Sequence, residues 1–189
     1  MIPALVEGYL EERLIGALWR QLGRHEEPLV VRNAGGSPFW AHARRYNEAG
    51  RHRIVLGLAD LEQEVCAPAA IDKLGKPLSA GFKLRLAVRM IESWIMADRE
   101  AFAAQFGLRV ADVPLQPDLL PHPKRTVVEL ARRSRKKLVR DAMIPAGVGL
   151  VGAEYTAFMA RFVESRWRLR HARTRSPSLE RACLRWSGA

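Results

Sequence analysis

The sequence predicts an α/β protein with a mostly parallel sheet of four strands flanked by helices, and with further helices toward the C-terminus. Two observations lead to this class. Short apolar runs in the first half of the chain alternate with stretches of helical periodicity, and this alternation is typical of β-α-β units with right-handed crossovers. The chain has 189 residues, which is long enough to bury one substantial hydrophobic core.

Local patterns define the elements of the first half. Apolar residues at Ile2–Val6 predict a buried strand, and leucines recur every four residues from Leu10 to Leu22. That spacing keeps the leucines on one face, so it predicts an amphipathic helix. In chain order, the predicted strands are Ile2–Val6, 29–31, 53–58 and 83–89, the predicted helices are 10–22, 39–49, 67–74 and 91–106, and a loop is predicted over 33–38.

The second half is predicted to be helical and basic. A proline-rich surface connection spans 110–123, and helices are predicted over 125–139, from Tyr155 to Trp167, and from a cap at Ser176 to Trp186. We therefore divide the chain into an α/β core, residues 1–109, and a basic helical extension, residues 110–189, packed on the same domain.

The formal net charge of +11 is unevenly distributed. Residues 1–64 carry eight Lys and Arg against nine Asp and Glu, whereas the remainder carries 23 against 11. Such an excess attracts polyanions, although Arg-rich composition also serves solubility. No apolar stretch approaches a membrane span and no secretory signal is evident, and Cys66 and Cys183 have no metal-type spacing. We expect a cytoplasmic protein with no membrane partner.

Acidic residues follow two of the apolar runs. Glu7 and Gly8 end the first predicted strand, and Asp60 and Glu62 follow the third. The carboxyl ends of parallel strands meet at one rim, where open α/β sheets bind ligands, and hard cations prefer carboxylate oxygens. If the chain stays extended past Asp60, the two acids at 60 and 62 point the same way. The alternative is that they are solvated loop charges.

Two acids follow in the first turn of the next predicted helix. Glu11 and Glu12 are favoured there by the helix dipole. We expect at least one of them to serve only as a helix-start residue.

Two further residues have both a functional and an ordinary interpretation. Glu92 lies where the fourth predicted strand gives way to a helix, so it is a candidate for binding a metal or orienting a base. Alternatively, it is a helix-start acid paired with Arg85 or Arg89. Lys124 follows a stiff Pro-His-Pro segment and is a candidate for neutralising a phosphate, or else an ordinary surface lysine.

Residues 124–140 hold eight Lys and Arg and one acid. The apolar residues of this run, Leu138 among them, are predicted to face the core. Either the cations follow a nucleic-acid backbone or they form a solvated face. Residues 161–185 add eight arginines as a second candidate surface. The cations that we select for nucleic-acid binding are Arg132, Arg133, Arg135, Lys136 and Lys137.

Taken together, these motifs resemble the Toprim domain of topoisomerases, primases, small ribonucleases and overcoming-lysogenization-defect (OLD) nucleases. The chain is still more similar to an uncharacterised bacterial Toprim-like family, domain of unknown function 4276. The segments that carry the resemblance are Val6-Glu7-Gly8, Asp60-Leu61-Glu62, Cys66-Ala67-Pro68, Val88-Arg89-Met90-Ile91-Glu92-Ser93-Trp94, Ala97-Asp98-Arg99-Glu100, Pro123-Lys124 and Ser176-Pro177-Ser178. One departure is Glu62, where the Toprim pattern expects a second aspartate.

The resemblance implies a Toprim-like (Rossmannoid) fold and Mg²⁺- or Mn²⁺-dependent cleavage of phosphodiesters in DNA or RNA. Asp60 and Glu62 would hold the metal, with Glu92 as a further ligand. Glu7 would be a ligand or the acid/base, and Lys124 would act with it in catalysis. The resemblance also implies an ATPase partner in phage or mobile-element defence. The alternative is a non-catalytic nucleic-acid-binding or protein-interaction module with the same fold.

Overall fold

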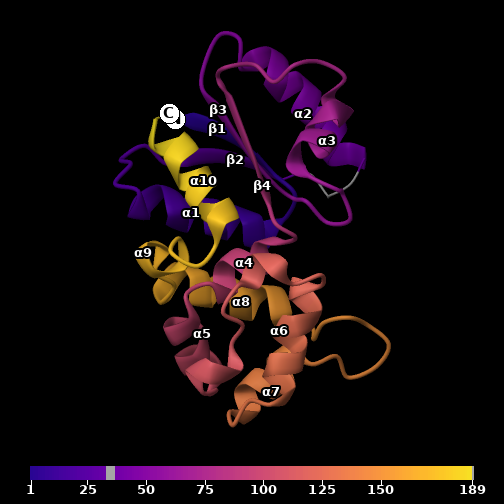
Figure 1. The fold of residues 1–189 in the computed structure, drawn as a ribbon, viewed down its shortest axis with the longest axis vertical. Coiled ribbons are helices and arrows are strands. Elements are labelled where there is room, and N and C mark those ends of the chain that lie inside the picture. Colours follow the sequence, from indigo (N-terminus) through magenta and orange to yellow (C-terminus); the bar gives the residue numbers. More distant parts are fainter. Residues whose placement is uncertain (33–36, 189) are drawn as a thin grey trace.

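The protein, described by a computed structural model over residues 1–32 and 37–188, is built on one parallel sheet in the order β2-β1-β3-β4 (Figure 1). The strands are β1 (Ile2–Val6), β2 (Pro28–Arg32), β3 (Val55–Asp60) and β4 (Phe82–Ala87). The predicted α/β class with a parallel four-stranded sheet is confirmed. Residues 33–36 of the predicted loop lie outside the described residues.

Helices cover both faces of this sheet. Alternate residues of β1 and β3, such as Val6 and Leu58, belong to a large core on the side of α1 (Tyr9–Gln21), and α8 (Tyr155–Ser165) packs on α1. The opposite face carries Leu5 and Ala59 in a smaller core. That core is closed by α2 (Ser37–Ala49), α3 (Ala67–Ile71) and the short 3₁₀ helix η1 (Asp72–Leu74). This burial of both faces explains why the central strands are almost wholly apolar.

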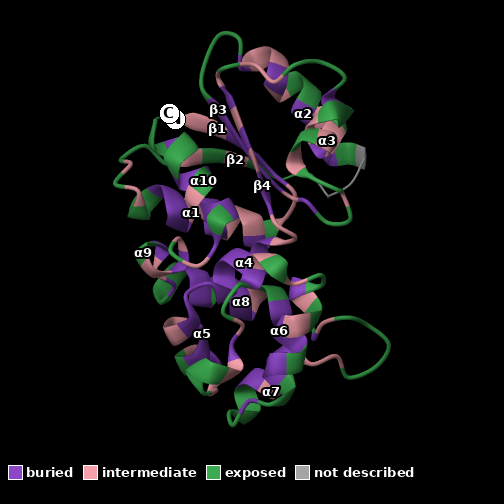
Figure 2. Cartoon of the chain, viewed as in Figure 1, coloured by how far each residue is buried: buried purple, intermediate pink, exposed green. Residues whose placement is uncertain are grey.

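The remaining helices form a second layer beyond the carboxyl edge of the sheet (Figure 1). They are α4 (Ile91–Met96), α5 (Arg99–Phe106), α6 (Pro123–Arg132), α7 (Lys137–Met143) and α9 (Leu169–Ala172), with η2 (Val110–Asp112) and η3 (Pro117–Leu119) between them. Buried residues run without interruption from the sheet into these helices (Figure 2). The division at residue 109 stays a prediction.

The last helix, α10 (Pro177–Ser187), returns to the sheet. It packs against β4, where the indole Nε1 of Trp186 donates to the backbone oxygen of Lys83 at 2.8 Å. Trp186 also meets Trp94 of α4 edge to face, with ring centroids 6.4 Å apart. None of the described helices is both long and apolar enough to cross a membrane.

Two predicted helices are wrong in extent. The single helix predicted over 91–106 is broken at Asp98, whose carboxylate accepts from the backbone N–H of Ala101 and so begins a new helix. The helix predicted over 125–139 ends at Arg132, and Ser134 accepts from the backbone N–H of Lys136 before α7 starts. Because this break changes the helical phase, Leu138 is 74% exposed rather than buried.

Candidate metal centre

Two carboxylates meet at the carboxyl edge of the sheet because their strands are neighbours. Glu7 follows β1 and Asp60 ends β3, and these strands pair in parallel with Val6 beside Leu58. The backbone N–H of Asp60 donates to Oε2 of Glu7 at 3.2 Å. Oδ1 of Asp60 accepts from the backbone N–H of Ile91, at the start of α4, at 2.8 Å. The acids are therefore held by the backbone of three adjoining segments.

Glu11 completes a group of three. Glu7, Glu11 and Asp60 each offer a carboxylate oxygen, and these oxygens lie within 4.8 Å of one another. Gly8 makes room for this arrangement, since a Cβ at that position would lie only 2.9 Å from Oε2 of Glu11. Its neighbour Glu12 instead contacts Arg13 and Arg32, at 2.7 and 2.9 Å. Of the two helix-start acids, only Glu11 belongs to the cluster.

A buried glutamate lies beside this group. Glu92, 1% exposed, accepts a hydrogen bond on Oε1 from the hydroxyl of Tyr155 at 3.0 Å, and Nζ of Lys124 is 3.7 Å from the same oxygen. Oε2 of Glu92 is buried with no hydrogen-bond partner in the described chain. The alternative pairing of Glu92 with Arg85 or Arg89 is not observed in the described residues. The sequence contained no signal for Tyr155, which is brought to the site by the packing of α8.

Two acids of the cluster, Glu11 and Asp60, have pKa values above those of isolated carboxyls. Burial, and then the negative charges of Glu92 and Glu7, raise the pKa of Glu11 to about 7. Burial, followed by the charges of Glu92 and Glu11, raises the pKa of Asp60 well above its usual value. Burial lowers the pKa of Lys124, but the surrounding carboxylates outweigh burial and raise it overall. A divalent cation among these oxygens would take the place of the protons.

Two cavities open at the cluster. One, of about 310 Å³, is lined by all three acids together with Glu92, Lys124 and Tyr155. The other, of about 560 Å³, shares Glu7 and Asp60 with the first and extends to Trp40, Arg44 and Lys73 between α2 and η1. Glu7 and Asp60 are therefore accessible from two sides, whereas Glu11 lines the first cavity.

Glu62 lies outside the group of three. The strand ends at Asp60, and Glu62 adopts a left-handed backbone conformation with φ of 50°, its N–H donating to the oxygen of Arg89 at 2.9 Å. The extended course past Asp60 is therefore not followed, so the strand geometry that would point the side chains of Asp60 and Glu62 the same way does not apply. Glu62 still lines both cavities, so it remains at the rim of the site.

The cations selected for nucleic-acid binding lie at the other end of α6. We call them the α6–α7 tip: Arg132, Arg133, Arg135, Lys136 and Lys137. Arg132 is about 12 Å along the helix axis from Lys124, at about 1.5 Å per residue. Three of the five are engaged within the chain: Arg133 contacts Asp112 at 2.6 Å, Lys136 donates to the oxygen of Ala104 at 2.7 Å, and Lys137 contacts Asp141 at 2.6 Å.

A second acidic group, Asp98, Glu100 and His171, also brings its ligand atoms close together. Its carboxylates already have cationic partners. Nη2 of Arg168 is 2.7 Å from Oδ1 of Asp98, and Nη2 of Arg175 is 2.7 Å from Oε1 of Glu100. These guanidinium groups neutralise the acids, so this group acts as a structural ion-pair network.

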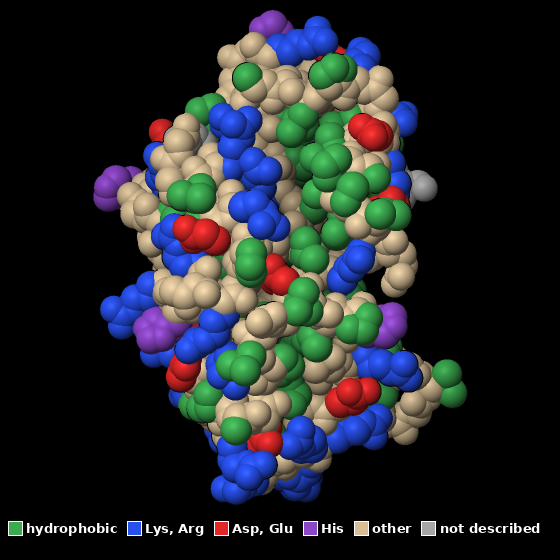
Figure 3. Space-filling model, in the orientation of Figure 1, with side chains coloured by type: hydrophobic (Ala, Val, Ile, Leu, Met, Phe, Trp, Pro, Cys, Tyr) green, Lys and Arg blue, Asp and Glu red, His purple; other side chains and the backbone are tan. Residues whose placement is uncertain are grey.

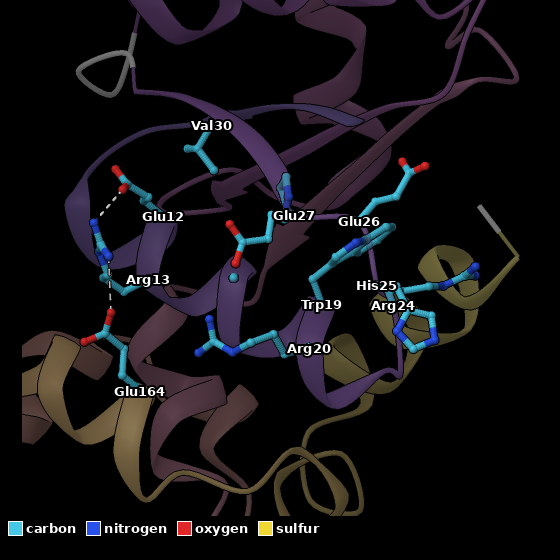
Figure 4. A pocket seen from close by; sticks show the side chains of 12 residues that line it. Glu12, Arg13, Trp19, Arg20, Arg24, His25, Glu26, Glu27, Val30 and Glu164 are labelled. Carbon is cyan, nitrogen blue, oxygen red and sulfur yellow. Dashed lines mark hydrogen bonds and ion pairs between the residues drawn. The ribbon is translucent and has the colours of Figure 1, made fainter. Parts of the chain in front are cut away.

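A cavity of about 450 Å³ lies apart from both groups, between α1 and the start of β2 (Figure 4). Three of its charged side chains pair with one another: Arg13 reaches Glu12 on one side and Glu164 on the other. The members of the acidic cluster do not line it. We therefore place the candidate site at the carboxyl edge of the sheet, where the carboxylates converge.

Comparisons of the chain with protein-family models, with curated proteins and with solved structures gave no match. The structure defines a class of protein, an α/β fold with a parallel sheet and an acidic cluster at its carboxyl edge. The arguments for function that follow start from this chain's own residues.

Proposed function

We propose that the protein is a Toprim-like, Mg²⁺- or Mn²⁺-dependent enzyme that cleaves phosphodiester bonds in nucleic acid. The observation that carries the proposal is the convergence of three carboxylates in one cavity with a buried glutamate oxygen that has no partner in the described chain. An unpartnered buried carboxylate oxygen is costly, and a cation beside it would remove that cost.

The donor set fits a hard divalent cation. All the candidate ligands are carboxylate oxygens, the type that Mg²⁺ and Mn²⁺ take in proteins. Glu7, Glu11 and Asp60 would hold the ion, and Glu92 would contribute its free oxygen. When bound, the ion would polarise a phosphate and lower the pKa of a water molecule.

The remaining side chains of the cavity supply positioning and charge. Lys124, held beside Glu92, would offset the negative charge that builds on the phosphate in the transition state. Tyr155 holds Glu92 in place through its hydroxyl. Glu7 either binds the ion or takes up a proton from the attacking water, the role that the resemblance implies.

The test is cleavage of supercoiled plasmid and of RNA in Mg²⁺ or Mn²⁺. We expect Asp60→Asn and Glu7→Gln to reduce the rate at least about a hundredfold, as loss of preorganised charge stabilisation typically does. Glu12→Gln is the matched control, because Glu12 follows Glu11 directly yet faces Arg13 and Arg32. Equal cleavage by the wild type and both site variants would overturn the proposal.

A non-catalytic module is the rival, and the position of Glu62 favours it, because the expected second ligand does not join the three acids. Binding of nucleic acid without cleavage in either metal would decide for this module. The ATPase partner and the defence role are proposed from the resemblance alone, and co-purification with an ATPase encoded nearby is their test.

A further inference from the structure

A second basic surface lies on β4 and α10, away from the α6–α7 tip. Lys83 and Arg85 alternate with Leu84, which points into the smaller core, so both lie on the sheet face that α10 covers. Arg181 and Arg185 lie one helical turn apart on α10 and are exposed. We call these four residues the α10–β4 column, and Figure 3 shows Lys and Arg side chains in a column over α10.

Within residues 1–32 and 37–188, the cations of this column lack acidic partners. In the described part of the chain, no carboxylate pairs with the side chains of Lys83, Arg181 or Arg185. Glu180, the acid of α10, is engaged by Arg173. The column therefore differs from three of the five cations of the tip, since Arg133 and Lys137 contact acids and Lys136 contacts backbone oxygens.

Arg85 is the least satisfied cation of the column. Its Nε is buried and has no hydrogen-bond partner in the described chain. Burial, and then the charges of Arg185 and Arg181, lower the pKa of the Arg85 guanidinium. The buried Nε is not accessible to a ligand, but the guanidinium is a fork of donors suited to a phosphate or carboxylate. An external anion beside its terminal nitrogens would relieve the repulsion from Arg181 and Arg185.

The spacing favours a linear polyanion over a single phosphate. Arg181 and Arg185 are separated by about 6 Å along the helix axis, and Lys83 and Arg85 by about 7 Å along the strand. The charges therefore form a row and do not converge on one point. Asp60 is the register partner of Ala87, two residues beyond Arg85. Arg85, the strand residue of the row nearest the acidic cluster, thus lies about 7 Å along the strand from the level of Asp60.

We propose that the α10–β4 column, and not the α6–α7 tip, is the main contact surface for the phosphodiester backbone of a nucleic acid. This inference rests on the proposed nucleic-acid substrate. Phosphate contacts of this kind position the substrate without reading its sequence.

The test measures binding of labelled single-stranded and duplex oligonucleotides in EDTA, across a series of salt concentrations. We expect the double variant Arg181→Ala/Arg185→Ala to bind on the order of tenfold more weakly at low salt. Its slope of log affinity against log salt should fall by about 2, since each phosphate contact contributes about 0.9 for duplex DNA. The matched control is Arg132→Ala/Arg135→Ala at the tip, which removes the same charge and should bind within about twofold of the wild type.

Circular dichroism of both double variants establishes that they are folded. An equal loss of nucleic-acid affinity in the two variants, or a greater loss in the tip variant, would overturn the assignment of the column as the main contact surface. So would binding to polyglutamate, or to phosphatidylserine vesicles, with no binding to nucleic acid. Because binding is measured without metal, absence of cleavage by the wild type would sink the proposed enzyme and leave the column intact. Unchanged binding of nucleic acid by the column variant would overturn the column assignment and leave the proposed enzyme intact.

Discussion

The two acidic groups of the protein have similar compactness but opposite surroundings. Asp98 and Glu100 face Arg168 and Arg175, and each carboxylate shares hydrogen bonds with a guanidinium group. Asp60 and Glu11 face Glu7 and Glu92, with Lys124 as the nearby cation. One group is internally neutralised, whereas the other concentrates negative charge in a cavity.

This difference shows that partners, more than residue types, indicate a binding site. A carboxylate that pairs with a cation inside the chain stabilises the fold. A carboxylate that faces other carboxylates either binds a cation and stays ionised, or takes up a proton and loses its charge. The same contrast separates the α10–β4 column from the α6–α7 tip. In both pairs, the candidate functional surface is the one on which charges of the same sign meet.

The largest expected effect on stability comes from Asp98. This side chain is fully buried, accepts three hydrogen bonds from Arg168 and caps α5. We expect Asp98→Asn to lower the free energy of unfolding by about 3 kcal/mol, the lower end for a broken buried pair because Arg168 is partly solvated. Asp60→Asn should not lower it, since it removes repulsion. Urea unfolding of the two metal-free variants checks the comparison, and a larger loss in Asp60→Asn would contradict it.

A divalent metal should bind at only one of the two acidic groups and should stabilise the protein through that group. Mn²⁺ at a hundred times its dissociation constant adds about 2.7 kcal/mol to a protein with one site, which raises the melting temperature by about 5–10 °C for a chain of this size. We expect this increase in the wild type and in Glu100→Gln, and its loss in Glu11→Gln. Thermal scans with and without Mn²⁺ measure it. An increase that survives in Glu11→Gln would place the ion elsewhere.

The two groups should respond to pH in opposite directions. The folded protein holds a proton on Glu11 up to about pH 7, whereas the unfolded chain loses it near the ordinary pKa of 4.5. The stabilisation from this proton is therefore present below pH 4.5 and is lost as the pH rises through 7. Hydrogen bonds from the backbone and from Arg175 outweigh burial and lower the pKa of Glu100, so its contribution is instead lost as the pH falls below 4.5.

The measurement is the melting temperature of the metal-free protein between pH 5 and 8. We expect the melting temperature to fall by a few degrees as the pH rises. This corresponds to a loss of about 1 kcal/mol in the free energy of unfolding, after allowing for partial solvation. Glu11→Gln should make this fall smaller, with a remainder from Asp60, whose pKa is also raised, and Glu100→Gln should leave the slope unchanged. A wild-type curve that rises through pH 7 would contradict the assigned direction.

The smallest effect is expected from Tyr155→Phe, which removes the hydroxyl donor to Glu92. The loss of one buried hydrogen bond should cost about 1 kcal/mol. The affinity for Mn²⁺ should fall about tenfold, the lower end for loss of a group that orients a ligand, because the three main carboxylates remain. Tyr46→Phe is the control, because Tyr46 packs against the smaller core and does not line the cavity of the acidic cluster. Isothermal titration with Mn²⁺ measures the affinity, and an equal change in both variants would argue against a positioning role.

Much of the fold is visible in local patterns. The apolar runs that become β1 and β3 and the leucine spacing of α1 follow from periodicity alone, and parallel pairing then brings Glu7 and Asp60 to one edge. The division of the predicted helices at Asp98 and at Ser134 was not predictable, because hydrogen bonds with Arg168 and with the oxygen of Phe106 hold these residues. Such contacts join residues far apart in the chain.

By itself, the sequence determined the class of fold and the rim at which two acids meet, since strand burial and helix periodicity are properties of neighbouring residues. Only the tertiary structure decided that Glu11 and not Glu62 joins those acids, that Glu92 lies against Tyr155 and Lys124, and that α10 returns to β4. The physical reason is that side-chain partners depend on the turn after Asp60 and on the docking of α8 and α10, which the whole core fixes.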